Sequence, residues 1–327
     1  NPVVFQKSGE GANPVVRPTT GTQGIRISGG DYFTFDGIDI AVASGQIPNY
    51  GYYVANASAT NGARNNVIKN CKITLNKANT NTKGIYDYYA TTPTSADGIN
   101  ANNTYQNITI ENANTGIYVY GHSTYKTFGN VIRDCTIGAA TADDMGGSSS
   151  GYGIYSYYQT GAQIYNNVIR NFTCTSSVYG IYHYYGDTTS SIYGNTISAL
   201  KTSSTYSDAY GIYALTASGT LDIYNNRVSS VGLTSTSSTY SGYGIHASLS
   251  STGTNVANVY NNMIWDIYSS YTGSGSTNYL TRGINLDAAT ATNTYNVDYN
   301  SIRIVGPTTA NRSEERRVGK ECSSRWS

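Results

Sequence analysis

The chain has 327 residues, of which only 12% are charged, and its formal net charge is +1. A nucleic-acid-binding protein would show a basic excess or a basic stripe, so the charge pattern excludes nucleic acid as a partner. No apolar run approaches the roughly 18 residues of a membrane-spanning helix, so we expect no membrane span.

The N-terminal segment precedes the repeated part of the chain. It starts NPVVFQKSGEGANPVV, without an initiator Met and without the basic and apolar regions of a secretory signal peptide. We expect residues 1–23 to form an irregular coil or cap. We also expect the whole chain to be an internal fragment of a larger protein.

One sequence unit then recurs through residues 24–311. It begins with Gly-Ile, usually followed by Tyr, and after a variable stretch it reads aromatic-x-Asn-x-Ile. From Gly116 onward the units are 37, 27, 31, 33 and 39 residues long. A period of this size with variable inserts is typical of a solenoid. The units begin at Gly84, Gly116, Gly153, Gly180, Gly211, Gly244 and Gly283.

The units favour a β-helix over other repeat folds. Each has about three short β-rich pieces and no helical periodicity, which disfavours leucine-rich and ankyrin repeats. A propeller blade needs four strands, usually in about 40 residues or more. We therefore predict an all-β fold, a single-stranded right-handed parallel β-helix (solenoid) of about 8–9 coils, stacked about 4.8 Å apart.

Alternation along the strands predicts stacked columns of equivalent side chains. Two apolar columns would face the core, and stacked Asn amides would bond to one another and turn the backbone at the same place in each coil. The first apolar column contains Ile117, Ile154, Ile181, Ile212, Ile245 and Ile284. The second contains Ile68, Ile132, Ile169, Ile197, Val228, Ile264 and Ile302, followed three residues later by Cys71, Cys135, Phe172, Leu200, Val231, Ile267 and Val305. The amide column contains Asn66, Asn130, Asn167, Asn195, Asn226, Asn262 and Asn300.

Three cysteines lie in the repeat, and an odd number implies no disulfide framework. Cys71 and Cys135 would lie two coils, or about 10 Å, apart, which exceeds the reach of a disulfide. We expect both to be buried free thiols that act as small apolar fillers.

The last sixteen residues, 312–327, differ from the rest of the chain. Their sequence, RSEERRVGKECSSRWS, carries eight charges, whereas the preceding 311 residues carry thirty-one. It resembles the translated read-through of a common DNA sequencing adapter, which implies a non-native tail. The alternative is a genuine basic tail.

The outward positions of the first strand are mostly Tyr. Ring columns at about 5 Å spacing offer ring faces and hydroxyl groups to sugars, so we predict a glycan-binding surface. The alternative is that the stacked rings only stabilise the sheet. The predicted ligand-binding columns are Tyr86, Tyr118, Tyr155, Tyr182 and Tyr213, and beside them Tyr88, Tyr120, Tyr157 and Tyr184. A third column contains Phe128, Tyr165, Tyr193, Tyr224 and Tyr260.

Polar residues also occupy an inward position of the same strand. They are Asp87, Ser156 and His183. A buried Asp or His needs a partner. Either these side chains are satisfied locally, or the strand twists there and exposes them.

The densest charged group consists of Glu111, Arg133 and Arg170, expected on successive coils, with Asp134 nearby. A lyase of this fold would need carboxylates for Ca²⁺ and a base that takes the sugar proton, so these four residues are the candidate catalytic residues. The alternative is a salt-bridge ladder on the surface. We expect no cofactor, since no metal-ligand spacing or nucleotide motif is present, and Ca²⁺ only if the protein is a lyase.

The pattern Gly-Ile-Tyr-x-Tyr followed by Tyr-Asn-Asn-x-Ile resembles the repeats of pectate-lyase-like right-handed parallel β-helix proteins. The segments NPVVFQKSGEGANPVV and SGGDYFTFDGIDI are similar to secreted surface proteins of Bacteroidetes-type bacteria. These resemblances imply an extracellular or cell-surface location and a polysaccharide partner. The superfamily includes lyases, hydrolases, adhesins and binding domains, so the fold alone does not choose among them.

Two functional hypotheses follow. The first is a non-catalytic segment of a larger secreted or cell-surface protein, monomeric by itself, that binds a polysaccharide or surface glycan or acts as an adhesive stalk. The second is a polysaccharide lyase or glycoside hydrolase that acts on an acidic polysaccharide.

Overall fold

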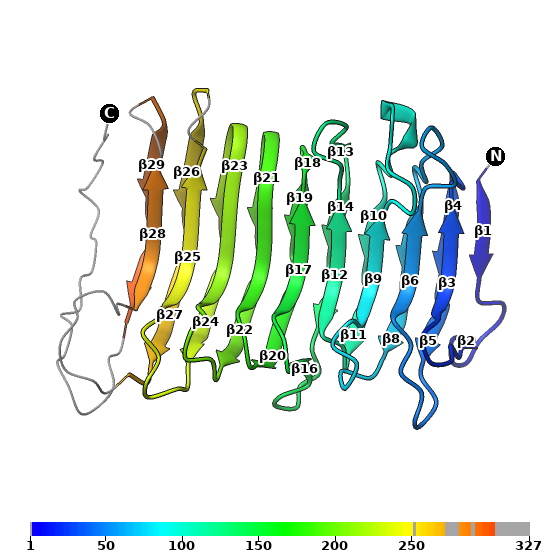
Figure 1. The fold of residues 1–327 in the computed structure, drawn as a ribbon, viewed down its shortest axis with the longest axis horizontal. Coiled ribbons are helices and arrows are strands. Elements are labelled where there is room, and N and C mark those ends of the chain that lie inside the picture. Colours follow the sequence, from blue (N-terminus) through cyan, green and yellow to red (C-terminus); the bar gives the residue numbers. More distant parts are fainter. Residues whose placement is uncertain (1, 251–252, 272–280, 289–291, 305–327) are drawn as a thin grey trace.

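The computed structural model describes residues 2–250, 253–271, 281–288 and 292–304. These residues form a right-handed parallel β-helix whose coils lie side by side along the long axis, from β1 at the N-terminal end to β29 at the other (Figure 1). The predicted fold class is confirmed. The described part of the chain has no helix that is long and apolar enough to span a membrane.

The strands form two sheets, of 19 and 11 strands, and every pairing between two described strands is parallel. The first and second strands of each coil belong to the larger sheet, and the third strand belongs to the smaller one. The first strands are β3 (Gln23–Ser28), β6 (Tyr50–Ala55), β9 (Lys83–Tyr88), β12 (Thr115–Tyr120), β17 (Gly151–Tyr157), β21 (Val178–Tyr193), β23 (Ala209–Tyr224), β25 (Gly242–Leu249) and β28 (Arg282–Ala288).

The long strands β21 and β23 continue without a break into the second position of their coils. The other strands at or just before this position are β1 (Val3–Gln6), β4 (Phe33–Asp36), β7 (Val67–Lys69), β10 (Thr104–Gln106), β13 (Thr127–Phe128), β14 (Val131–Arg133), β18 (Gln159–Thr160), β19 (Gln163–Tyr165), β26 (Val256–Tyr260) and β29 (Thr294–Asp298). The smaller sheet contains β2 (Val15–Val16), β5 (Asp39–Ala41), β8 (Lys72–Thr74), β11 (Thr109–Glu111), β15 (Thr136–Ile137), β16 (Met145–Gly147), β20 (Val168–Cys174), β22 (Thr196–Thr202), β24 (Arg227–Leu233), β27 (Met263–Ser269) and β30 (Ser301–Arg303). A short 3₁₀ helix, η1 (Ala96–Gly98), lies in the insert between β9 and β10.

Of residues 1–23, expected to form a cap, residues 2–22 contribute two strands to a partial first coil, and Gln23 begins β3. In this segment β1 pairs with β4, and β2 pairs with β5. The predicted tail, residues 312–327, and Val305 lie outside the described residues.

The Gly-Ile start of each unit is explained by close packing between the first and third strands. A Cβ atom on Gly180 would lie 2.5 Å from the carbonyl oxygen of Gly211 and 2.6 Å from Cγ2 of Ile197. Only glycine fits between these atoms. The isoleucine that follows, Ile181, is fully buried and pairs with Ile154 and Ile212, so the first apolar column is confirmed.

The second predicted apolar column is wrong, because it joins two separate columns. Ile132 lies on a second strand and pairs with Tyr105 and Ile164. Ile169 instead lies on a third strand, where it pairs with Ile137 and Ile197. All of these side chains are buried, so the prediction of a core position holds while the assignment to a single column fails.

The reason is that the same local motif turns the chain at two different corners, at the first corner in the early coils and at the second corner in the later ones. The first corner separates the first and second strands, and the second corner separates the second and third. At both corners a residue with positive φ precedes an Asn, as in Asn102-Asn103 (φ 55° at Asn102) and Asn166-Asn167 (φ 56° at Asn166). Asn and Gly tolerate this left-handed conformation best.

The predicted amide column is therefore two ladders. At the first corner the main-chain N–H of Asn66 donates to Oδ1 of Asn103 (3.0 Å), and that of Asn103 donates to Oδ1 of Asn130 (2.8 Å). At the second corner the ladder runs through Asn167, Asn195, Asn226, Asn262 and Asn300. From Asn195 onward, each amide oxygen in the second ladder accepts two hydrogen bonds from the Asn of the preceding coil.

Cys71 and Cys135 lie at the second corner in coils that precede this ladder, whereas Cys174 lies at the end of β20. The main-chain N–H of Cys135 donates to Oδ1 of Asn167 (3.0 Å), so Cys135 stands where later coils have Asn and not in the column of Phe172. Cys71, Cys135 and Cys174 are buried free thiols, which confirms the prediction for the first two. Burial raises the pKa of Cys135 to about 12, so its thiol stays neutral.

Replacing Asn195 with Ala tests the second-corner ladder. Oδ1 of Asn195 accepts the main-chain N–H and Nδ2 of Asn167 (both 3.0 Å), and its Nδ2 donates to the carbonyl of Ile164 (3.0 Å). Because these buried groups would lose their partners, we expect Asn195→Ala to lower the free energy of unfolding by about 3 kcal/mol in urea denaturation.

A matched control is Asn296→Ala, at an exposed position where the amide donates only to Oδ1 of Asn258. It should change the free energy of unfolding by less than about 0.5 kcal/mol. Equal effects of the two substitutions would contradict a stabilising role for the ladder.

Candidate functional site

Tyrosines on the outward side of the first strands form a continuous surface, which we call the tyrosine face. The pairing of the strands confirms that the two predicted ligand-binding columns are stacked. They contain Tyr86, Tyr118, Tyr155, Tyr182 and Tyr213, and Tyr88, Tyr120, Tyr157 and Tyr184.

The structure adds a column that our sequence interpretation missed. It contains Tyr152, Tyr179, Tyr210 and Tyr243. Each of these residues directly precedes the Gly of a Gly-Ile unit, so the signal was present in the sequence.

The rings of the tyrosine face stack on one another along the axis of the β-helix. Tyr118 and Tyr155 have ring centroids 4.2 Å apart and planes at 4°, and Tyr120 and Tyr157 are 5.0 Å apart at 5°. From β12 to β21 the ring faces are therefore occupied by neighbouring rings, whereas the rings of Tyr86 and Tyr88 are tilted against the next ring of their columns. Burial raises the pKa of Tyr155 and Tyr182 above that of free tyrosine, so these phenols remain hydrogen-bond donors at neutral pH.

The other predicted aromatic column lies on the second strands and contains one wrong member. Phe128 pairs with Thr160, whereas the position before Tyr165 is held by Arg133. The remaining rings are stacked 4.7–4.9 Å apart with planes within 6° of parallel. They are Tyr165, Tyr193, Tyr224 and Tyr260.

One lysine is embedded in the tyrosine face. Nζ of Lys83 lies 5.5 Å from the ring centroid of Tyr50, 5.1 Å from that of Tyr86 and 5.4 Å from that of Tyr118. Burial lowers the pKa of Lys83 to about 8. Among the described residues Lys83 forms no ion pair with a carboxylate; its Nζ donates to the carbonyl of Asn81 (3.1 Å) and makes cation–π contacts with the three rings.

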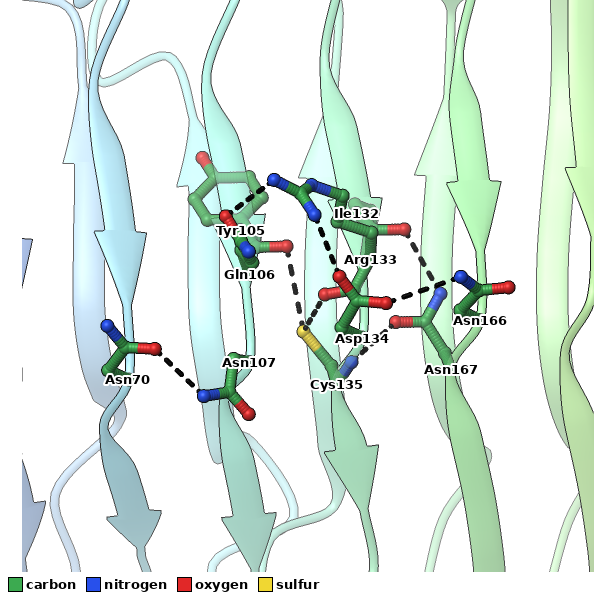
Figure 2. A network of polar contacts seen from close by, with 10 residues as sticks. All are labelled: Asn70, Tyr105, Gln106, Asn107, Ile132, Arg133, Asp134, Cys135, Asn166 and Asn167. Carbon is green, nitrogen blue, oxygen red and sulfur yellow. Dashed lines mark hydrogen bonds and ion pairs between the residues drawn. The ribbon is translucent and has the colours of Figure 1, made fainter.

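Two of the four candidate catalytic residues, Arg133 and Asp134, form an ion pair at the second corner (Figure 2). Nη1 of Arg133 donates to Oδ2 of Asp134 (2.8 Å), and Nη2 donates to Oε1 of Gln106 (2.8 Å). Asp134 has φ 57°, and its Oδ1 accepts a bond from Nδ2 of Asn166 (3.4 Å). These contacts give Asp134 the role that Asn plays at the same corner of other coils.

The other two candidates lie on the smaller sheet. Glu111 on β11 pairs with Lys72 (2.7 Å), and Nε of Arg170 on β20 donates to the carbonyl of Gly138 (3.2 Å). Glu111, Arg133 and Arg170 lie on successive coils, as expected, but they do not form one column, because Arg133 is on a second strand and the other two are on third strands. The second corner turns the chain directly after Arg133, and a whole coil lies between β11 and β20.

Carboxylates near this region are already engaged by protein groups. Asp143 pairs with Lys201 (2.8 Å), and Oδ2 of Asp144 accepts the main-chain N–H groups of Asn112 (3.1 Å) and Ala139 (2.9 Å). Within the described ranges, no three side chains of His, Cys, Asp or Glu lie close enough together to hold a metal ion.

The inward polar residues Asp87, Ser156 and His183 are buried, so the strand does not twist to expose them. Asp87 accepts hydrogen bonds from the hydroxyl of Tyr105 (2.6 Å), from Nδ2 of Asn100 (2.7 Å) and from Nδ2 of Asn103 (3.4 Å). This network fastens the insert that contains η1 to the core. Desolvation raises the pKa of Asp87 to about 6, although its three donors oppose the shift.

His183 and Ser156 form a second interior pair. Nδ1 of His183 lies 3.0 Å from the hydroxyl of Ser156, while Nε2 has no partner among the described residues. Burial lowers the pKa of His183 to about 4, so the ring is neutral. Asp87 is two coils away from Ser156 and all three side chains are closed to solvent, so they do not form a catalytic triad.

Comparisons with known proteins add one structural likeness. No protein-family model matches the chain, and no curated protein matches its sequence. Among solved structures, the A-module of the mannuronan C-5 epimerase AlgE4 of Azotobacter vinelandii is similar, with a TM-score of 0.38 and 14% sequence identity. The likeness covers 90% of this chain and 88% of that one.

The Asp87 network predicts a specific dependence of stability on pH. Because the folded-state pKa of about 6 lies above the ordinary value of 3.8, the folded protein holds this proton more tightly than the unfolded chain does. Stability from Asp87 is therefore full below about pH 4 and is lost as the pH rises through 6, by about 3 kcal/mol in total.

The variant Asp87→Asn cannot titrate, so its stability should lack this component. The difference between wild type and variant in free energy of unfolding should fall as the pH rises from 4 to above 6 in urea titrations. The neutral His183 and His246 act in the opposite direction, but both proteins contain them and they cancel in the difference. A difference that is constant with pH would disprove the buried titration.

Proposed function

We propose that this chain is a non-catalytic, polysaccharide-binding segment of a larger extracellular or cell-surface protein, with the tyrosine face as its binding surface. The observation that carries the proposal is the ordered stacking of the rings, which repeats equivalent phenol hydroxyls once per coil. The segment would act as a monomer, without a cofactor, in a protein like the secreted surface proteins of Bacteroidetes-type bacteria.

The spacing and chemistry of the hydroxyls fit a polysaccharide. Coils lie about 4.8 Å apart, comparable to the length of one pyranose residue in an extended chain, so consecutive sugars would meet equivalent groups. A phenol hydroxyl both donates and accepts, as sugar hydroxyls do. Because the ring faces are occupied by stacking, hydrogen bonds and ring edges would carry the recognition inside the columns.

The alternative, a polysaccharide lyase or glycoside hydrolase, has less support. Glycosidases hold two carboxyl groups about 5–10 Å apart beside the scissile bond. Glu111 lies on the smaller sheet and Asp134 lies at a second corner, and each is bound to a basic side chain of its own. A lyase or a glycosidase needs its catalytic groups gathered at one site, and the four candidate residues do not form such a site.

Tyrosine-to-phenylalanine substitutions test the proposal without disturbing the ring stacks. We expect Tyr155→Phe and Tyr182→Phe each to weaken binding about 2- to 10-fold, since each removes a hydrogen bond of about 0.5–1.5 kcal/mol. Binding would be measured by a glycan array and then by affinity electrophoresis with the best polysaccharide. Tyr193→Phe, in the separate column on the second strands, is the control and should leave binding unchanged.

Three outcomes would count against the proposal. They are no binding of wild type to any glycan, equal losses in the test and control variants, and release of unsaturated or reducing sugar ends during incubation. The last would establish the enzymatic alternative.

A further inference from the structure

The closest parallel rings of the tyrosine face belong to Tyr118 and Tyr155, on the neighbouring strands β12 and β17. Their centroids are 4.2 Å apart and their planes differ by 4°. No other described pair of rings is both as close and as parallel. Along the same column the neighbouring pairs, Tyr86 with Tyr118 and Tyr155 with Tyr182, are 5.4 Å and 5.0 Å apart.

We propose that the tyrosine face is a site of oxidative modification, at which a one-electron oxidant joins Tyr118 to Tyr155 as dityrosine. The inference does not depend on the proposed polysaccharide binding. It follows from the ring geometry and from the chemistry of phenols.

The reaction removes one electron and one proton from each phenol, and the two phenoxyl radicals form a carbon–carbon bond between ring positions ortho to the hydroxyls. Each of these carbons then passes its hydrogen to a phenol oxygen, which restores both aromatic rings. The net loss is two electrons and two protons. With a haem peroxidase as catalyst, hydrogen peroxide takes them up and is reduced to two molecules of water.

Parallel stacking favours the coupling step. The unpaired electron of a phenoxyl radical occupies orbitals perpendicular to the ring plane, so stacked rings direct these orbitals at each other. The rings of Tyr118 and Tyr155 are half-buried and therefore within reach of an oxidant, while the β-helix fixes their separation. Edge-on pairs such as Tyr152 with Tyr155, at 88°, lack this overlap.

If solvent exposure of the rings, and not their stacking, selected the coupled tyrosines, a different residue would react, and this residue provides the control. Tyr206 is 79% exposed, the most accessible of the described tyrosines, but it contacts no other described ring. If accessibility decided the outcome, Tyr206 would be the main site of coupling and would link separate molecules. If stacking decides it, the product is intramolecular and joins adjacent coils.

The experiment treats the 327-residue chain, in dilute solution, with peroxidase and hydrogen peroxide, isolates the monomer, and maps linked peptides by mass spectrometry. We expect dityrosine fluorescence in the monomer and a dominant linked peptide that contains Tyr118 and Tyr155 and is two hydrogen atoms lighter than the sum of its parts. Tyr155→Phe, which keeps the ring, should lower the total dityrosine of the monomer, since Tyr118 is then left with the tilted ring of Tyr86 (5.4 Å, 48°) and the more distant ring of Tyr120 (6.2 Å). Tyr206→Phe should leave it unchanged.

The proposal is overturned by any of three results. The monomer contains no dityrosine, the linked peptides contain mainly Tyr206, or Tyr155→Phe leaves the yield of the monomer unchanged. Thermal unfolding of each variant before oxidation verifies that the fold is intact. Loss of glycan binding would leave these outcomes unaffected, so this proposal and the proposed function fail independently.

Discussion

Parallel hydrogen bonding between successive coils is the constraint on which the structure depends. It fixes each strand directly over its equivalent, at about 4.8 Å, so every side chain has its counterpart as nearest neighbour. Each position therefore favours a residue type that packs well against the same residue type in the next coil. Isoleucine fills the core, asparagine satisfies another asparagine, and tyrosine stacks on tyrosine. The polar composition of the chain is compatible with a stable fold because these groups satisfy one another in columns.

The corners decide which side chains can meet. At each second corner a residue in the left-handed conformation turns the chain, and Asp134 performs this task with an ion pair to Arg133. Its carboxylate is thereby committed to the backbone turn and to its neighbours. The same turn separates Arg133 from Glu111 and Arg170, which lie on the other sheet. Charges that are dense in the sequence are thus dispersed around the coil.

In the tyrosine face, ring stacking between successive coils determines which groups of the tyrosines can take part in binding or chemistry. Stacking stabilises the sheet, but it also occupies the ring faces that sugars would otherwise use. What remains is a set of hydroxyl rows with a regular repeat. The same contact holds phenols at a separation and orientation suited to radical coupling. Structural and functional interpretations of these rings are therefore compatible, since the stack is the framework that positions the hydroxyls.

The sequence by itself determined the fold class, the Gly-Ile column and the two main tyrosine columns. Inward and outward side chains alternate within a single strand, so the residues after each Gly-Ile pair lie at fixed positions on that strand and can be assigned from the sequence. Only the tertiary structure decided which corner each Asn-x-Ile motif occupies, because inserts of variable length separate the strands and both corners have the same local conformation. It also decided the partners of Asp87, since an insert brings Asn100, Asn103 and Tyr105 back to it from 13 to 18 residues further along the chain. Contacts made across such inserts have no periodic signal in the sequence.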